Sequence, residues 1–240
     1  MNAKISVFIA FTALIGVSNL QGESIPAKVL KVDGEATVNI PGKGNQPLVA
    51  GALIPEGSEI KTAAGSEVVV GLTPGAGTIL EENTTMEIEK LSVEKKGEKL
   101  TKREVMLNLK NDDAAAVSFL KSFDGVSDFK IKTTTGIAAA RGTIWRTTSS
   151  VIQVIQGNVE FSFGGRTVSV PAGSATTTTG PDGGTITTLP DSVLNDIINA
   201  VQGATSIILT RTVDGNLIIE DPTTATAEVI SLDEVNSPDQ

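Results

Sequence analysis

Residues 131–145 read Ile131-Lys132-Thr133-Thr134-Thr135-Gly136-Ile137-Ala138-Ala139-Ala140-Arg141-Gly142-Thr143-Ile144-Trp145. This stretch joins a β-type start to three alanines, an Arg-Gly-Thr corner and the only tryptophan of the chain. A large aromatic ring beside glycine and alanine indicates close packing at this point. We expect the rest of the chain to be arranged around it.

The composition outside this stretch predicts an all-β protein. The chain has 240 residues, of which 40% are hydrophobic and 20% charged, as in a globular protein. Turn signals recur every six to twelve residues between short runs rich in Val, Ile and Thr. Only 3% of the residues are aromatic, which favours a thin, regularly layered core.

Several segments give individual predictions. Residues 84–110 alternate like a hairpin that turns at Lys96-Gly97. Residues 112–123 fit a short helix or a strand, and their position between strands favours the strand. One-face spacing of apolar residues predicts a helix from Pro190-Asp191 to Gly203. A second hairpin is expected around 214–216.

The predicted domain organisation follows these segments. Gln156-Gly157-Asn158 is expected to be a turn between two strands. The tail from residue 221 is acidic and loop-like, so we expect it to be flexible. The resulting divisions are a signal peptide (1–22), a β-domain (27–186), a helix with a β-hairpin (187–220) and a flexible tail (221–240).

Faint internal repetition suggests two versions of the all-β fold. Ile60-Lys61-Thr62 recurs at 131–133, and Ala64-Gly65-Ser66 recurs at 172–174. Repeated strand-turn units of this kind suggest a β-solenoid or a duplicated, two-layered β-fold. Because the spacing is not constant, chance recurrence of tripeptides remains an alternative.

The N-terminus predicts export. A short positive start containing Lys4 precedes an apolar run from Ile5 to Val17, with small residues suited to cleavage after Ser18 or Gly22. We therefore expect a protein of the periplasm or cell envelope, or one outside the cell, with no stable membrane span after cleavage. The alternative is an uncleaved anchor, for which the run is short.

Composition also limits the chemistry. The net charge of −9 disfavours nucleic-acid binding. The chain contains no His, Cys or Tyr, which removes the commonest general base and the thiolate nucleophile. No spacing of metal ligands or catalytic motif is present. We expect no enzyme activity, cofactor, metal or small-molecule ligand.

At this point the sequence resembles a known family, the FecR-like domain of bacterial envelope proteins. Residues 127–145 are similar to its most specific signature, in which an Ile-x-Thr strand leads to an Arg-Gly-Thr corner. The resemblance covers about 60% of the chain, from Lys28 to about Gly173. The segments that carry it are VLKVDGEATV (29–38), PLVAGALIPEGSEIKTAAGSEVVVGL (47–72), SDFKIKTTTGIAAARGTIW (127–145), VIQGNVEF (154–161) and VSVPAGSATT (168–177).

The chain also departs from the family pattern. Thr134 stands where the family often has proline, Ala139 where it often has glycine, and Asp112-Asp113 where a glycine turn is usual. Iron-citrate-type regulators with this domain carry an anti-sigma segment and a membrane span before it, whereas here the domain follows the expected signal peptide directly. The resemblance therefore implies the domain without implying control of a sigma factor.

Within the signature, Arg141 is the residue for which a binding role is easiest to argue. Its planar fork of donors could bind an anionic ligand or partner. The preferred interpretation is structural: because small residues surround it, we expect a partly buried arginine that pairs with Asp128 or Glu160. We expect Trp145 to close the core and Gly142 to supply an unusual φ. The signature residues, all interpreted as structural, are Ile131, Thr133, Gly136, Arg141, Gly142, Thr143 and Trp145.

The sequence leaves three functions open. The preferred one is a non-enzymatic interaction, scaffold or signal-sensing module of the envelope, whose partner is another envelope protein. The alternative is a structural or adhesive surface protein that displays loops on a rigid β-domain. A hydrolase or lyase is the third, and it has the least support because the chain lacks the usual catalytic groups and aromatic platforms.

Overall fold

The computed structural model describes residues 22–179, 183–204, 209–211, 217–220 and 227–230. The predicted signal peptide and the turn at 214–216 therefore lie outside the described residues, apart from Gly22. These residues form mostly β-structure with one helix, as the sequence predicted.

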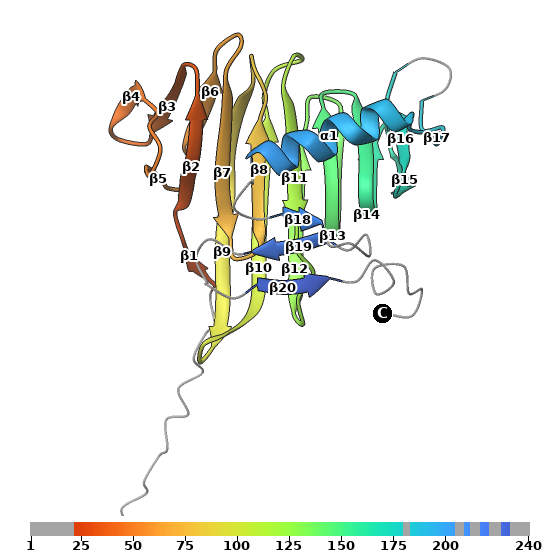
Figure 1. The fold of residues 1–240 in the computed structure, drawn as a ribbon. Coiled ribbons are helices and arrows are strands. Elements are labelled where there is room, and N and C mark those ends of the chain that lie inside the picture. The colour runs from red at the N-terminus through yellow and green to blue at the C-terminus, as the bar shows by residue number, and fades with distance from the viewer. Residues whose placement is uncertain (1–21, 180–182, 205–208, 212–216, 221–226, 231–240) are drawn as a thin grey trace, which may run out of the picture.

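The main sheet contains seventeen strands and curls into a half-barrel, so that its two halves face each other (Figure 1). Its ladders are antiparallel except for the parallel pair β10–β12. Of the two predicted architectures, the two-layered fold describes this arrangement, because a solenoid would stack parallel strands in successive coils. The strands are β1 (Glu23–Ser24), β2 (Ala27–Asp33), β3 (Ala36–Ile40), β4 (Gly44–Pro47), β5 (Leu53–Ile54), β6 (Glu59–Thr62), β7 (Glu67–Thr73), β8 (Ala76–Leu80), β9 (Thr85–Lys96), β10 (Lys99–Leu109), β11 (Ala115–Leu120), β12 (Val126–Lys132), β13 (Gly136–Thr148), β14 (Val151–Phe163), β15 (Arg166–Pro171), β16 (Ser174–Thr177) and β17 (Thr187–Thr188).

The pairing of the strands defines the two layers. The first layer, here called the helix-side layer, runs through β5, β2, β7, β8 and β11 to the second half of β13. The second, here called the open layer, runs through β4, β3, β6, β9, β10 and β12 to the first half of β13. Strands β13 and β14 belong to both layers, so the main chain itself joins them.

The main core lies between the layers. In the open layer, alternate residues such as Val105, Leu107 and Leu109 of β10 point inward and are at most 1% exposed. In the helix-side layer, Val68 and Val70 of β7 point into the same core. Alternation of this kind places one face of each strand on the core, which explains why the period-2 pattern was visible in the sequence.

The helix-side layer is buried on both faces. Helix α1 (Asp191–Ala204) crosses its outer face, in front of β8, β11, β13 and β14 in Figure 1. Ile197 and Val201 of the helix pack against Val69, Ile79 and other outward residues of this layer. This second core explains why β7, β8 and β11 read as continuous apolar or small runs, since strands covered on both faces do not alternate.

Most segment predictions agree with the observed elements. The hairpin at 84–110 is β9–β10, the ambiguous segment at 112–123 contains strand β11, and α1 begins at Asp191. The C-terminal hairpin is formed by β18 (Leu209–Arg211) and β19 (Leu217–Glu220).

Two predictions were wrong. Gln156-Gly157-Asn158 is no turn, because β14 continues through it from Val151 to Phe163. The turn signal belongs to a bulge within a long strand, where Gly157 has φ +80°. A third strand, β20 (Ala227–Ile230), pairs with β19 in the segment that was predicted to be a loop-like tail. Its Ala-Glu-Val-Ile sequence is too short for a reliable period-2 signal.

Candidate functional site

The seven signature residues lie on β12, on β13 and on the connection between them. Ile131 and Trp145 are fully buried and point into the main core. Thr133 holds the connection, because its hydroxyl accepts a hydrogen bond from the backbone N–H of Gly136 at 3.1 Å. Gly136 begins β13, where a Cβ atom would lie 2.6 Å from the backbone oxygen of Ser162. Only a glycine fits so close to the neighbouring strand.

The Arg-Gly-Thr segment forms the corner at which β13 passes from one layer to the other. Up to Ala140 the strand pairs with β12, and from Ile144 it pairs with β11. Gly142 has φ +58°, a conformation that L-residues resist. The hydroxyl of Thr143, which is buried, lies 2.9 Å from the carbonyl oxygen of Arg141 and 3.0 Å from that of Asn158. It therefore ties β13 to β14 across the irregularity.

Gly157 of β14 completes this corner. A Cβ atom at Gly157 would lie 2.5 Å from the carbonyl oxygen of Gly142 and 2.8 Å from the Thr143 hydroxyl. The missing Cβ atom of Gly157 therefore lets the two backbones come into close contact, whereas Gly142 supplies the positive φ and leaves room for the side chain of Ser122. We call this unit, from Arg141 to Thr143 with Gly157, the corner.

Trp145 lies just past the corner, inside the main core. Its ring meets that of Phe129 edge-to-face, with the centroids 5.2 Å apart. An edge-to-face pair stabilises a core by about 0.5–1.5 kcal/mol beyond the area it buries. The indole N–H has no hydrogen-bond partner among the described residues. The ring is not exposed and offers no platform to a ligand.

Arg141 is not the buried clamp that the sequence predicted. Its side chain is exposed, and neither Asp128 nor Glu160 pairs with it. Asp128 pairs instead with Lys130, at 2.9 Å. The physical reason is strand alternation: Ala138 and Ala140 fill the crowded interior, so Arg141, which is one residue further, points outward.

The arginine that does hold the layers together is Arg103 of β10, which is 1% exposed. Its Nε donates to the hydroxyl of Ser127 at 2.8 Å, within the open layer. Its Nη1 donates to the carbonyl oxygen of Pro74 at 3.2 Å, and its Nη2 donates to that of Lys121. These two carbonyls belong to the helix-side layer, at the β7–β8 turn and after the end of β11. We call this arrangement the Arg103 clamp.

The clamp carries a buried charge that is satisfied by neutral groups. The guanidinium carbon lies 4.6 Å from the ring centroid of Phe123, which adds a cation–π contact. Burial lowers the pKa of Arg103 to about 10, so the side chain remains positive at neutral pH. Sequence reasoning missed this residue, although a signal existed. Arg103 has the same parity as the inward residues Val105, Leu107 and Leu109.

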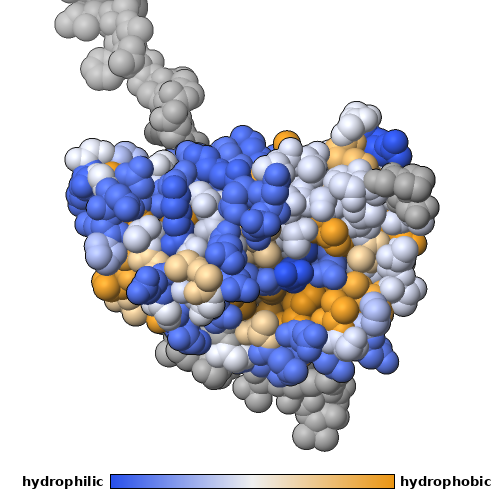
Figure 2. Space-filling view, turned by 90° about the horizontal axis from the view of Figure 1, so that it is seen from above, coloured by the Kyte–Doolittle hydropathy of each residue, from blue (hydrophilic) through white to orange (hydrophobic). Residues whose placement is uncertain are grey.

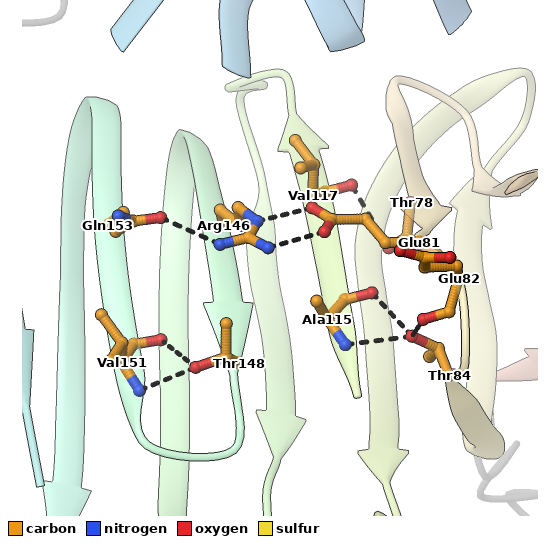
Figure 3. Close-up of polar contacts among 10 residues, drawn as sticks. All are labelled: Thr78, Glu81, Glu82, Thr84, Ala115, Val117, Arg146, Thr148, Val151 and Gln153. Atoms are coloured by element: carbon orange, nitrogen blue, oxygen red, sulfur yellow. Dashed lines mark hydrogen bonds and ion pairs between the residues drawn. The ribbon is translucent and has the colours of Figure 1, made fainter. Parts of the chain in front are cut away.

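A second arginine, Arg146, pairs with Glu81 on the outer face of the helix-side layer (Figure 3). Its Nε and Nη2 donate to the two carboxylate oxygens of Glu81 at 2.5 and 2.6 Å. Its Nη1 lies 3.4 Å from the amide oxygen of Gln153. The bond to Glu81 raises the pKa of Arg146 above its ordinary value. This bidentate pair spans from β13 across β11 to the end of β8.

Near this pair, Thr84 anchors the start of β11 (Figure 3). Its buried hydroxyl accepts from the backbone N–H of Ala115 at 3.0 Å and lies 3.1 Å from the carbonyl oxygen of the same residue. The hydroxyl of Thr62 lies 2.6 Å from the carbonyl oxygen of Glu81 and accepts from the N–H of Thr84. These hydroxyls satisfy backbone groups where strands end.

The outer face of the open layer carries a ladder of ion pairs. Lys110 lies between Glu59 and Glu87, at 3.0 and 2.7 Å. The bonds to these carboxylates raise the pKa of Lys110, and the Lys110 ammonium holds the pKa of Glu59 below its usual range. Lys132 pairs with Glu89 further along the same face. Such a face is well hydrated and its charges largely cancel.

The described part of the chain brings together no set of three carboxylate, His or Cys ligands suited to a metal ion. None of its helices is long and apolar enough to cross a membrane. Viewed from above, the surface is largely hydrophilic, with one larger hydrophobic area and smaller hydrophobic spots elsewhere (Figure 2). The arginines and hydroxyls described above are engaged in joining strands and layers, except for Arg141. This arrangement stabilises the sheet.

Comparison with known proteins gives one structural similarity. No protein-family profile matches the chain, and no curated protein matches its sequence. The chain is similar to the crystal structure of a "putative anti-sigma factor" from Parabacteroides distasonis ATCC 8503, with a TM-score of 0.43 and 14% identity. The similarity covers 64% of this chain and 68% of that chain. At this level it carries no information about activity.

Proposed function

We propose that this chain is an exported, non-enzymatic protein of the cell envelope, whose FecR-like β-domain acts as an interaction, scaffold or signal-sensing module. The proposal rests on the N-terminal sequence, with its positive start, apolar run and small residues, and on the resemblance of residues 127–145 to the FecR-like signature.

The observation that carries the non-enzymatic part is how the polar side chains are used. The chain has no His, Cys or Tyr. Arg103 joins the two layers, Arg146 and Glu81 neutralise each other, and Thr143 fastens the corner. A catalytic site needs polar groups that converge on a space for a substrate, whereas these groups converge on one another. A rigid, double-layered sheet of this kind is suited to presenting a surface to a partner.

The proposal is tested by crosslinking in living cells, followed by identification of the attached proteins. We expect one or a few specific envelope proteins to be captured. Cell fractionation with protease treatment of intact cells supplies the second measurement, and we expect the protein to be protected inside the envelope. Digestion on intact cells would contradict a periplasmic module and favour the adhesive surface protein. Recovery from the cytoplasm would contradict export itself.

A further inference from the structure

The part of the hairpin β9–β10 that surrounds its turn carries a charge opposite to that of the whole chain. Between residues 90 and 103 it holds six Lys or Arg and two Glu, whereas the net charge of the chain is −9. Lys90 and Lys102 are paired with Glu56 and Glu94, and Arg103 is buried in the clamp. The excess positive charge is therefore concentrated at the end of the hairpin.

That end, here called the basic tip, consists of residues 95–99 (Lys95-Lys96-Gly97-Glu98-Lys99), all exposed. Lys95 and Lys96 form no ion pair within the described residues. Lys99 lies 3.8 Å from Asp124, and both of these side chains are largely exposed, so this contact hardly neutralises the lysine. The tip thus differs from the ladder on the open layer, where the lysines sit between carboxylates.

The shape of the hairpin projects these charges. Figure 1 shows the paired ends of β9 and β10 reaching beyond the neighbouring strands, at the end of the sheet away from α1. An apolar side chain accompanies them: Val126, opposite Lys102 in the β10–β12 ladder, is 55% exposed. Lysines beside an exposed apolar residue at a projecting tip suit the interface of a charged membrane.

The N-terminal part of the chain reaches the same end of the molecule. Strand β1 pairs with β9 at Val93 and Ser92, directly before the basic tip. In sequence, the apolar run that ends at Val17 is only a few residues upstream of Glu23. If the run is removed by cleavage after Gly22, the new α-amino group lies on Glu23, which is opposite Val93 of β9. If it is retained, it tethers this end of the molecule to the bilayer.

We propose that the basic tip docks the protein, tip first, on a bilayer surface rich in anionic phospholipids. The acidic remainder is repelled by the same surface, which orients the molecule with the ladder and α1 away from it. This inference specifies one contact of the proposed envelope module and rests on its export, but the binding itself does not require any protein partner.

The test uses the protein purified from cells, with the apolar N-terminal run cleaved or retained as it is there. It measures the partition of this protein onto vesicles at low and physiological salt. One set of vesicles contains phosphatidylglycerol and the other only phosphatidylcholine. We expect binding to the anionic vesicles that weakens as salt increases. A lysine near an anionic surface strengthens partition by about fivefold, so Lys95→Gln, Lys96→Gln and Lys99→Gln together should weaken it on the order of 100-fold.

A matched variant separates the tip from net charge. Lys28, Lys43 and Lys61 are also exposed, and replacing these three by Gln changes the charge by the same amount elsewhere on the sheet. We expect this control to retain binding. Equal loss in both triple variants, unchanged binding of the tip variant, or equal binding to both vesicle types would overturn the inference. Absence of vesicle binding with specific crosslinks in the envelope would remove the docking and leave the proposed function intact.

Discussion

The corner and the Arg103 clamp both connect the two layers of the sheet, but they do so by different physical means. At the corner the main chain itself crosses between layers, and Gly142 and Gly157 allow the backbones to come together. At the clamp no chain crosses, and one buried guanidinium reaches from β10 to two carbonyls of the opposite layer. The corner therefore depends on what is absent, a Cβ atom, whereas the clamp depends on a charged side chain.

The difference explains why the arginine of the signature is not the arginine that holds the fold. A corner made of backbone needs small residues, and Arg141 can point to solvent without loss. A contact between layers that no chain crosses needs a long side chain with several donors. The planar guanidinium of Arg103 donates to Ser127, Pro74 and Lys121, at the cost of removing a charge from water.

The largest expected effect follows from removing the clamp. Arg103→Ala should lower the free energy of unfolding by about 3–4 kcal/mol, because it leaves a cavity and strips the carbonyls of Pro74 and Lys121 of their donor. Urea unfolding followed by tryptophan fluorescence measures this, since Trp145 is buried in the core. Arg103→Lys should recover only part of the loss, as an ammonium lacks the planar fork. A loss below 1 kcal/mol would show that the clamp is dispensable.

The corner should respond to a single added methyl group. Gly157→Ala places a Cβ atom against the carbonyl oxygen of Gly142 in a φ that alanine resists, so we expect a loss of about 2–3 kcal/mol. The matched control is Gly173→Ala, which has a similar φ of +71° and no atom within 4 Å of the added Cβ. The control should cost about 1 kcal/mol. Equal losses in the two variants would mean that close approach contributes nothing at the corner.

A smaller effect is expected from the pair on the outer face. Glu81→Gln keeps an acceptor for Arg146 but removes the charge, and both side chains are about one-third exposed. We expect a loss of about 1 kcal/mol that shrinks in high salt. Double-mutant analysis with Arg146→Gln would measure the coupling. We expect this coupling to be smaller than the effect of Arg103→Ala, because Arg146 is partly exposed whereas Arg103 is buried. An equally large coupling would contradict that expectation.

The smallest effect is predicted for the signature arginine. Arg141→Ala should change stability by no more than about 0.5 kcal/mol, because the side chain is exposed and unpaired among the described residues. Thermal unfolding compared with Arg103→Ala gives the contrast directly. If the protein instead melts several degrees lower, the side chain of Arg141 stabilises the corner after all. Unchanged melting with loss of an envelope crosslink would assign Arg141 to partner binding.

Local patterns in the sequence predicted many of the elements. Alternation in residues 84–110 predicted the hairpin β9–β10, and one-face spacing predicted α1, because both patterns reflect which side of an element meets the core. The strand β11 was harder to recognise. Its run of Ala, Val, Phe and Leu is buried on both faces, and a doubly buried strand has no period to distinguish it from a helix.

The candidate site was predicted less well, for reasons of register and distance. The small residues before Arg141 suggested a crowded place, but strand parity puts them inside and the arginine outside. The residues around Gly157 are typical of a turn in the sequence. They form a bulge because the chain on both sides of Gly157 continues to pair with β13. That partner lies many residues away in the chain.

The sequence by itself determined the all-β class, the position of the helix and the close packing around Gly142 and Trp145. These features follow from local backbone preferences and from the side on which apolar residues fall. Only the tertiary structure decided that Arg103 holds the layers together, that Arg141 faces solvent and that the lysines of the basic tip stand unpaired. Each of these depends on which groups of an opposite strand lie within a few ångströms. The spacing of residues along the chain does not reveal which distant strands pair.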